Sequence, residues 1–252
     1  MTTNNLIMEI GNLPNSQHIY PSPLVAFNLQ MAGKPIEVII PKNELARVKE
    51  IFQQNEYSVL NHCSFEGKRT IINVGANVGL FSLYMKMNYP DSKIFAFEPV
   101  PSTFELLKLN TLNLADINIF PFALFDEEKI ETIQLHVDNS GANTIKVQDQ
   151  YKSHFESNVE ILLKKAGKVL SELNINKIDI LKIDTEGCEV EILESLQSFL
   201  PETDYVLVQY HSEADQRKID SLFENFKVFS SNAITINCGQ VKYINSKLLD
   251  LA

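Results

Sequence analysis

From Thr70 onward, apolar runs of strand length alternate with segments whose apolar residues recur at helical spacing. The predicted strands are Ile71–Val74, Ile94–Phe97, Ile119–Phe122, Ile178–Ile183 and Tyr205–Val208. The predicted helices are Leu80–Asn88, Thr103–Leu114 and Val190–Phe199. Strands that are apolar at every position are covered by helices on both faces, which is typical of a mainly parallel sheet. The alternation therefore predicts a doubly wound α/β sheet.

The segment before Thr70 is interpreted as an N-terminal extension. Pro14–Pro23 is the only proline-dense stretch and predicts an arm. Ile36–Ile40 predicts a strand, and the spacing of Leu45, Val48, Ile51 and Phe52 predicts a helix after it. We expect residues 1–69 to form this arm, with the strand and helix packed on a second domain of residues 70–252.

Two further stretches depart from the alternation. Between the third and fourth core strands we expect an insertion at about residues 127–170, in which Ile130–Val137 alternates as a strand does and Val159–Leu163 is either strand or helix. The turn-rich run Asn139–Thr144 either lines an acceptor pocket or is a solvated hairpin loop. The tail predicts antiparallel strands at one edge of the sheet, at Val228–Phe229, Ile234–Ile236 and Val241–Ile244.

Charge and composition limit the partners of the chain. It has 22 Lys and Arg against 32 Asp and Glu, a net charge of -10, and its only arginines are Arg47, Arg69 and Arg217. A phosphate backbone needs basic side chains, so we expect no nucleic-acid partner. With 44% hydrophobic residues the chain has the composition of an ordinary globular protein.

The cysteines and the apolar runs bear on location. Cys63, Cys188 and Cys238 are widely spaced and form no C-x-x-C pair, so neither a disulfide framework nor a structural zinc site is predicted. Met1–Gly11 lacks the basic and apolar regions of a secretory signal, and no apolar run is long enough to span a membrane. We therefore expect a soluble, cytoplasmic protein.

Ligands of open α/β sheets lie beyond the carboxyl ends of the strands, so the residues after each strand are candidates for the site. The first core strand runs into Asn73-Val74-Gly75-Ala76-Asn77-Val78-Gly79, where two of the nine glycines of the chain are four residues apart. The second ends in Phe97-Glu98-Pro99, where one carboxylate can accept both hydroxyls of a nucleoside ribose. Alone, the glycine run is equally well a plain tight turn, and Glu98 a solvated charge.

The dinucleotide motif G-x-G-x-x-G is not met, because Asn77 and Leu80 occupy its second and third glycine positions. This argues against an NAD-dependent oxidoreductase, which we retain as an alternative. A protein that binds the cofactor without catalysis is a second alternative.

Four segments together resemble the FkbM family of S-adenosylmethionine-dependent methyltransferases. They are Asn73–Ser82, Phe97–Pro99, Ala123–Leu124 and Leu181–Glu189. The resemblance spans about Thr70 to His211 and implies a class I, Rossmann-like methyltransferase fold with a seven-stranded, mainly parallel sheet. The family commonly has Asp where this chain has Asn73, so a negative charge expected near the cofactor's ammonium group is missing.

The resemblance also implies roles for individual residues. Asn73, Gly75, Asn77 and Gly79 would surround the methionine and ribose portions of S-adenosylmethionine, and Glu98 would bind the ribose hydroxyls. Phe122, Ala123 and Leu124 would lie against the adenine. Asp184 would reach the sulfonium, to which a carboxylate is attracted.

Asp184, Glu186 and His211 are the candidate catalytic residues. His211 or Asp184 would accept the proton of a substrate hydroxyl. The alternatives are helix-dipole chemistry for the two carboxylates and a structural hydrogen bond for the histidine. We expect no metal, although these three side chains could hold magnesium or manganese.

The function expected from the resemblance is therefore methyl transfer from S-adenosylmethionine to a hydroxyl of a small molecule. Sugar alcohols, natural-product alcohols of secondary metabolism and lipid head groups are all compatible acceptors. The sequence predicts neither the acceptor nor the oligomeric state.

Overall fold

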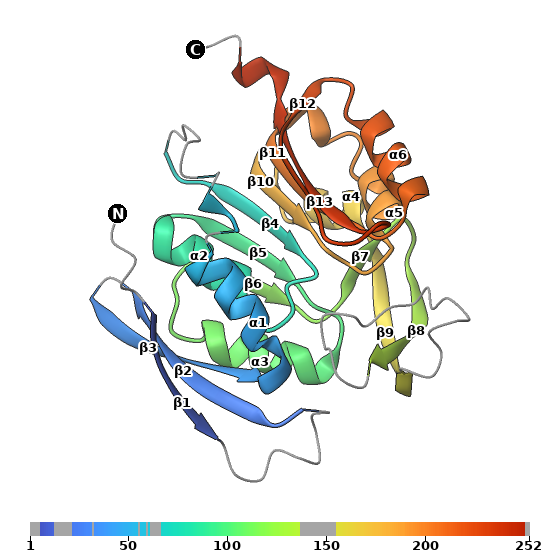
Figure 1. The fold of residues 1–252 in the computed structure, drawn as a ribbon. Coiled ribbons are helices and arrows are strands. Elements are labelled where there is room, and N and C mark those ends of the chain that lie inside the picture. Colours follow the sequence, from blue (N-terminus) through green and yellow to red (C-terminus); the bar gives the residue numbers. More distant parts are fainter. Residues whose placement is uncertain are drawn as a thin grey trace.

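The computed structural model describes residues 6–12, 22–31, 33–54, 56–58, 60, 67–136 and 155–249, without the side chains of 6–12, 136 and 155–157 (Figure 1). Most of the predicted arm at Pro14–Pro23, the turn at Asn139–Thr144 and Cys63 lie outside these residues.

In chain order the strands are β1 (Leu6–Asn12), β2 (Leu24–Met31), β3 (Lys34–Pro41), β4 (Thr70–Val74), β5 (Lys93–Phe97), β6 (Ile117–Phe120), β7 (Ala123–Phe125), β8 (Lys129–His136), β9 (Phe155–Lys165), β10 (Ile178–Ile183), β11 (Thr203–Tyr210), β12 (Phe226–Ala233) and β13 (Gly239–Asn245). The α-helices are α1 (Leu45–Val48), α2 (Leu80–Asn88), α3 (Pro101–Thr111), α4 (Ala166–Glu172), α5 (Glu189–Ser195) and α6 (Glu213–Leu222). Shorter helical turns cover Lys42–Glu44, Lys49–Gln53, Leu200–Glu202 and Ser246–Leu248. No described helix is long and apolar enough to cross a membrane.

The central sheet has seven strands in the order β12-β13-β11-β10-β4-β5-β6. The strands from β11 to β6 are parallel, and β13 runs antiparallel to both β11 and β12. This confirms the predicted seven-stranded, mainly parallel sheet with antiparallel pairing near one edge. All five predicted core strands and all three predicted helices are present, with ends that shift by up to four residues. In the tail, the strand predicted at Ile234–Ile236 is wrong, because these residues form the turn between β12 and β13.

Helices cover both faces of this sheet, as the continuous rather than alternating hydrophobicity of its strands predicts (Figure 1). Alternate strand residues point to opposite faces. Ile71 and Ile180 pack with the apolar residues of α2 and α3, whereas Ile72 and Leu181 pack with those of α4, α5 and α6. Pro101 opens α3 at a position where proline costs no helical hydrogen bond.

The N-terminal residues form a separate antiparallel sheet, β1-β2-β3, and the apolar side chains of β2 and β3 join the α2 and α3 side of the core. The predicted strand and helix are β3 and the helical residues 42–53, but β1 and β2 were not anticipated. Asn110 of α3 joins this sheet to the core. Its Nδ2 donates to the carbonyls of Ile39 (2.9 Å) and Val78 (2.8 Å), and its Oδ1 accepts from the Ile39 N–H (2.8 Å).

The stretch between β6 and β10 contains a third sheet, β7-β9-β8. Strands β8 and β9 are antiparallel, and β7 runs parallel to β9. Val159–Leu163 is therefore a strand rather than a helix. Helix α4 begins directly after β9 and was not predicted, because Gly167 was interpreted as the end of the segment.

Candidate active site

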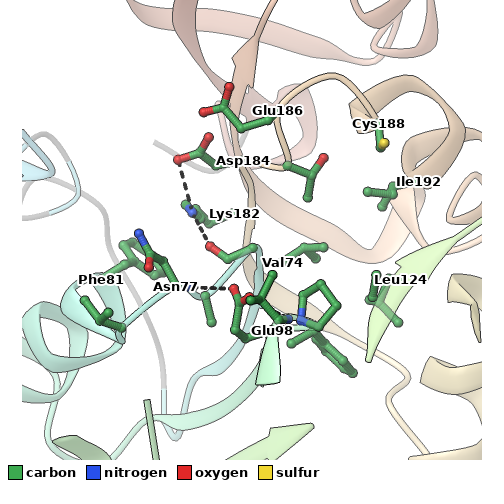
Figure 2. A pocket seen from close by; sticks show the side chains of 18 of the residues that line it. Val74, Asn77, Phe81, Glu98, Leu124, Lys182, Asp184, Glu186, Cys188 and Ile192 are labelled. Carbon is green, nitrogen blue, oxygen red and sulfur yellow. Dashed lines mark hydrogen bonds and ion pairs between the residues drawn. The ribbon is translucent and has the colours of Figure 1, made fainter. Parts of the chain in front are cut away.

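A cleft opens at the carboxyl ends of β4, β5 and β10, the sheet edge where ligands of α/β proteins bind (Figure 2). Its empty volume is about 1020 Å³, including the part open to solvent. Six lining side chains are acidic or basic: Glu44, Arg47, Glu98, Lys182, Asp184 and Glu186. Of the predicted site residues, the cleft is lined by Gly75, Asn77, Glu98, Ala123, Leu124, Asp184 and Glu186.

The turn after β4 needs its two glycines for packing. A Cβ on Gly75 would lie 1.8 Å from the backbone oxygen of Asp184, and one on Gly79 would lie 2.9 Å from Cδ1 of Leu107. Both residues also have positive φ, +72° and +94°. Gly75 therefore allows the ends of β4 and β10 to meet, which is a reason beyond the expected clearance for a ligand.

Glu98 is tied to this turn. Its Oε2 accepts the backbone N–H of Asn77 (2.9 Å), and its Oε1 accepts that of Val100 (3.0 Å). Burial raises the pKa of Glu98 to about 7, although both hydrogen bonds act to lower it. Each carboxylate oxygen can accept more than one hydrogen bond, so Glu98 can still accept from a ligand.

Asp184 faces a buried lysine. Nζ of Lys182 lies 3.4 Å from Oδ2 of Asp184 and donates to the carbonyl of Gly75 (2.9 Å), as the dashed lines of Figure 2 show. Burial alone would raise the pKa of Asp184. The positive charges of Lys182, Arg47 and His211 outweigh burial, so the pKa is lowered and Asp184 is a carboxylate.

His211 lies between two carboxylates. Its Nε2 is 3.2 Å from Oε2 of Glu186, and its Nδ1 is 3.2 Å from Oε1 of Glu189. Burial would lower the pKa of His211, but these two acidic partners raise it to about 11. At neutral pH His211 is therefore an imidazolium, which cannot accept the proton of a substrate hydroxyl.

Glu189 organises the loop that carries these groups. Its Oε1 accepts the N–H and the hydroxyl of Thr185 (2.9 and 3.1 Å) and the N–H of Gly187 (3.1 Å). Glu186 between them has a positive φ of 57°. Glu189 belongs to the segment that carries the resemblance, but its bonding to the loop was not anticipated from the sequence.

One ligand atom from each of Asp184, Glu186 and His211 lies within 4.8 Å of the others, which is close enough for a metal site. These groups are already compensated by ion pairs, Asp184 by Lys182 and Glu186 by His211. The expectation that the site works without a metal therefore stands as a prediction.

Four predicted site residues are not among those that line the cleft: Asn73, Gly79, Phe122 and His211. Asn73 is fully buried in β4, where its Nδ2 donates to Ser82 Oγ (3.0 Å). Gly79 is the residue before α2 and lies against Leu107 of α3, so it shapes the turn from behind.

The other two residues, Phe122 and His211, contact residues that line the cleft. The ring of Phe122 packs against Phe97, 5.7 Å between centroids, and Phe97 lines the cleft. His211 reaches the site through Glu186. Direct contact of either side chain with a ligand stays a prediction.

A sequence profile described as "Methyltransferase FkbM domain" matches residues 73–233, which include the glycine turn, Glu98 and the Asp184 loop. This chain belongs to the FkbM methyltransferase family. The central sheet has the seven strands, mainly parallel, that the resemblance to this family implies.

Curated relatives carry methyltransferase names. "Methyltransferase 1" of Beauveria bassiana is 30% identical over 59% of this chain, and the match covers 65% of the relative. The chain thus matches slightly less than two thirds of that protein. "Hexuronic acid methyltransferase AglP" of Haloferax volcanii is 22% identical over 82% of each chain. Among solved structures, Aeropyrum pernix fibrillarin with S-adenosyl-L-methionine is 11% identical with a TM-score of 0.48, over 95% of this chain and 99% of that one.

Part of the cleft wall lies outside the matched FkbM domain. Four lining residues come from the segment that precedes it: Glu44, Arg47, Ile51 and Tyr57. Within the matched domain, Ile133 of β8 and Ile161 and Leu163 of β9 add apolar side chains to the cleft wall. Sequence reasoning did not assign these residues to the site. For the apolar residues among them the signal was apolar periodicity, which predicts a buried face without saying what it faces, and Glu44 and Arg47 had no such signal.

Proposed function

We propose that this FkbM family protein transfers a methyl group from S-adenosylmethionine to a hydroxyl oxygen of a small molecule. The observation that carries the proposal is Glu98, a buried carboxylate bonded to the glycine turn at the cleft formed by the family's motifs. Membership of the family supports the methyltransferase part, and the chemistry of the cleft supports the choice of cofactor.

The cleft suits a cationic nucleoside. Four of its lining residues are acidic and two are basic, and both basic residues pair with carboxylates, Lys182 with Asp184 and Arg47 with Glu50. A dinucleotide would place a pyrophosphate in this acidic surrounding, whereas S-adenosylmethionine has no phosphate. Oδ1 of Asn77 is buried without a partner among the described residues, so it can accept from a ligand at the turn.

In the proposed complex, Glu98 accepts the ribose hydroxyls while Gly75 and Asn77 lie around the ribose and methionine portions. Gly79 holds the shape of this turn from behind. Ala123 and Leu124 contact the adenine. Phe122 supports that wall through its contact with Phe97 rather than by touching the ligand.

When bound, S-adenosylmethionine supplies a methyl carbon that is activated by its sulfonium. Asp184, a carboxylate inside the cleft, attracts this positive charge. The protein has to hold the acceptor oxygen in line with the methyl carbon and the sulfur, and such positioning contributes about 7 to 11 kcal/mol in favourable cases.

Glu186 is the group we propose as proton acceptor. It lines the cleft, and burial raises its pKa, which makes it a better base than an exposed carboxylate. His211, as an imidazolium, holds Glu186 in place through their ion pair. In this proposal Glu186 is the general base and His211 is a positioning residue.

The test is transfer of radiolabelled methyl from S-adenosylmethionine to a panel of sugars, uronic acids and natural-product alcohols. Uronic acids are included because one relative is named as a hexuronic acid methyltransferase. We expect Glu186→Gln to lower kcat about 100-fold or more, with little change in the KM for the cofactor. Glu194→Gln, an exposed position on α5, is the matched control. If the cofactor binds but none of the acceptors is methylated, the result favours the non-catalytic alternative.

A further inference from the structure

The amino-acid end of S-adenosylmethionine carries an ammonium and a carboxylate. In the proposed complex Glu98 binds the ribose, Asp184 faces the sulfonium and Glu186 accepts the proton, while Lys182 pairs with Asp184. Asn73 is neutral, buried and not part of the cleft lining. The remaining charged residues of the cleft wall are therefore the candidates for these two charges.

Two cleft residues with opposite charge lie in the segment before the domain. Glu44 ends the helical turn Lys42–Glu44, and Arg47 lies in α1, three residues later. Residues three apart in continuous helical turns lie on one face. Both line the cleft together with Asn77 and Phe81, and Glu44 is only 2% exposed.

This pair lines the same cleft as Glu98 and Asp184, the residues proposed for the ribose and the sulfonium. The charge of Glu44 acts on Glu98, whose pKa it helps to raise, and the charge of Arg47 acts on Asp184, whose pKa it helps to lower. The amino-acid chain of the cofactor starts at the sulfur next to the ribose, so in the proposed complex it extends within the cleft that Glu44 and Arg47 line.

The guanidinium of Arg47 is fixed and retains donors. Its Nη1 lies 2.7 Å from Oε2 of Glu50 and 3.3 Å from Oε2 of Glu56, and its Nη2 donates to Oε1 of Glu56 (3.4 Å). Glu56 is held in turn by the side chains of Gln240 and Lys242 of β13. Because arginine has five N–H donors in a planar fork, these contacts leave N–H groups for another carboxylate.

We propose that Glu44 binds the ammonium and Arg47 the carboxylate of the amino-acid end of S-adenosylmethionine. The segment before the FkbM domain thereby completes the cofactor site. This inference rests on the proposed function, since it requires S-adenosylmethionine in the cleft.

The test compares two ligands by titration calorimetry. S-Adenosylhomocysteine has the amino-acid end, and 5′-methylthioadenosine has the same nucleoside without it. We expect Arg47→Gln and Glu44→Gln each to weaken S-adenosylhomocysteine binding by about 10-fold or more, the effect of losing a hydrogen bond to a charged group. Binding of 5′-methylthioadenosine should change less than about twofold. Arg217→Gln, which removes an arginine paired with Glu213 on exposed α6, is the matched control.

Equal loss of both ligands would overturn the inference, because it would mean that the segment only supports the fold of the cleft. Unchanged binding of S-adenosylhomocysteine would overturn it as well. If Arg47→Gln does not fold, Arg47→Lys must show the same selective loss, since lysine keeps the charge but not the fork. Wild-type protein that binds neither ligand would instead contradict the proposed function.

Discussion

The carboxylate of Glu98 accepts the backbone N–H of Asn77 at 2.9 Å, which joins the end of β5 to the turn after β4. Burial holds the pKa of this carboxyl at about 7. Its charge therefore changes within the neutral range, at the point where we propose that the ribose binds.

Cofactor affinity should accordingly depend on pH through Glu98. Ribose hydroxyls donate to the ionised carboxylate, so binding favours loss of the proton and strengthens as pH rises to about 7. We expect the affinity for S-adenosylhomocysteine to fall about tenfold from pH 8 to pH 6, measured by calorimetry. Glu98→Gln should bind more weakly and lose this dependence. A wild-type profile that is flat over this range would contradict the assignment.

His211 should stabilise the fold in a manner that depends on pH. Its pKa is raised from 6.5 to about 11, so its contribution is complete below pH 6.5 and is lost as pH rises through about 11. Replacing it also leaves Glu186 and Glu189 without their counter-charge. We expect His211→Gln to lower the free energy of unfolding by about 3 kcal/mol at pH 6, and by less at pH 9. Urea unfolding at both pH values measures this. If the loss of unfolding free energy caused by His211→Gln were larger at pH 9 than at pH 6, the proposed role of His211 would be wrong.

Gly75 should tolerate no side chain. Alanine there would place Cβ 1.8 Å from the carbonyl oxygen of Asp184, so the ends of β4 and β10 would have to separate. Gly33→Ala is the matched control, because its φ is also positive (+78°) but nothing lies within 4 Å of its Cβ position. We expect a loss of about 1 to 2 kcal/mol for Gly33→Ala, and of more than about 4 kcal/mol for Gly75→Ala. Equal losses in chemical denaturation would show that the close approach is unimportant.

Asn110 should hold the N-terminal sheet on the core. Alanine removes its three hydrogen bonds and leaves the N–H of Ile39 without this acceptor, for an expected loss of about 2 to 3 kcal/mol. The amide of Ile39 should also exchange faster with deuterium. Asn118→Ala removes only a long contact of 3.4 Å and should cost about 0.5 kcal/mol or less. Unchanged exchange at Ile39 would contradict the role of Asn110.

The central sheet was predictable because its strands are buried on both faces. Every residue of the predicted strand Ile178–Ile183 is buried, and β10 has the predicted bounds. The third strand was placed two residues late, because Phe122 resembles a strand residue although the chain leaves β6 at Pro121. Proline has no N–H to donate to a neighbouring strand. β1 and β2 were missed, β1 because Leu6–Asn12 mixes polar and apolar residues without a clear period.

The motif residues of the site were predictable only in part. Chain order places Glu98 and Asp184 at the same sheet edge, and the structure brings them to one cleft. Whether a side chain points into that cleft depends on strand parity and packing, and for this reason Asn73 turned out to be buried. The charge state of His211 depends on Glu189, which reaches it only in the folded chain. The contribution of Glu44 and Arg47 depends equally on tertiary packing.

The central claim is that S-adenosylmethionine binds across the tips of β4 and β5 through Glu98. A crystal structure of the protein grown with S-adenosylhomocysteine tests it most directly. We predict that the compound occupies this cleft, with its ribose hydroxyls within hydrogen-bonding distance of the Glu98 carboxylate. A cleft closed by side chains at saturating compound, or a compound bound with its ribose away from Glu98, would contradict the claim.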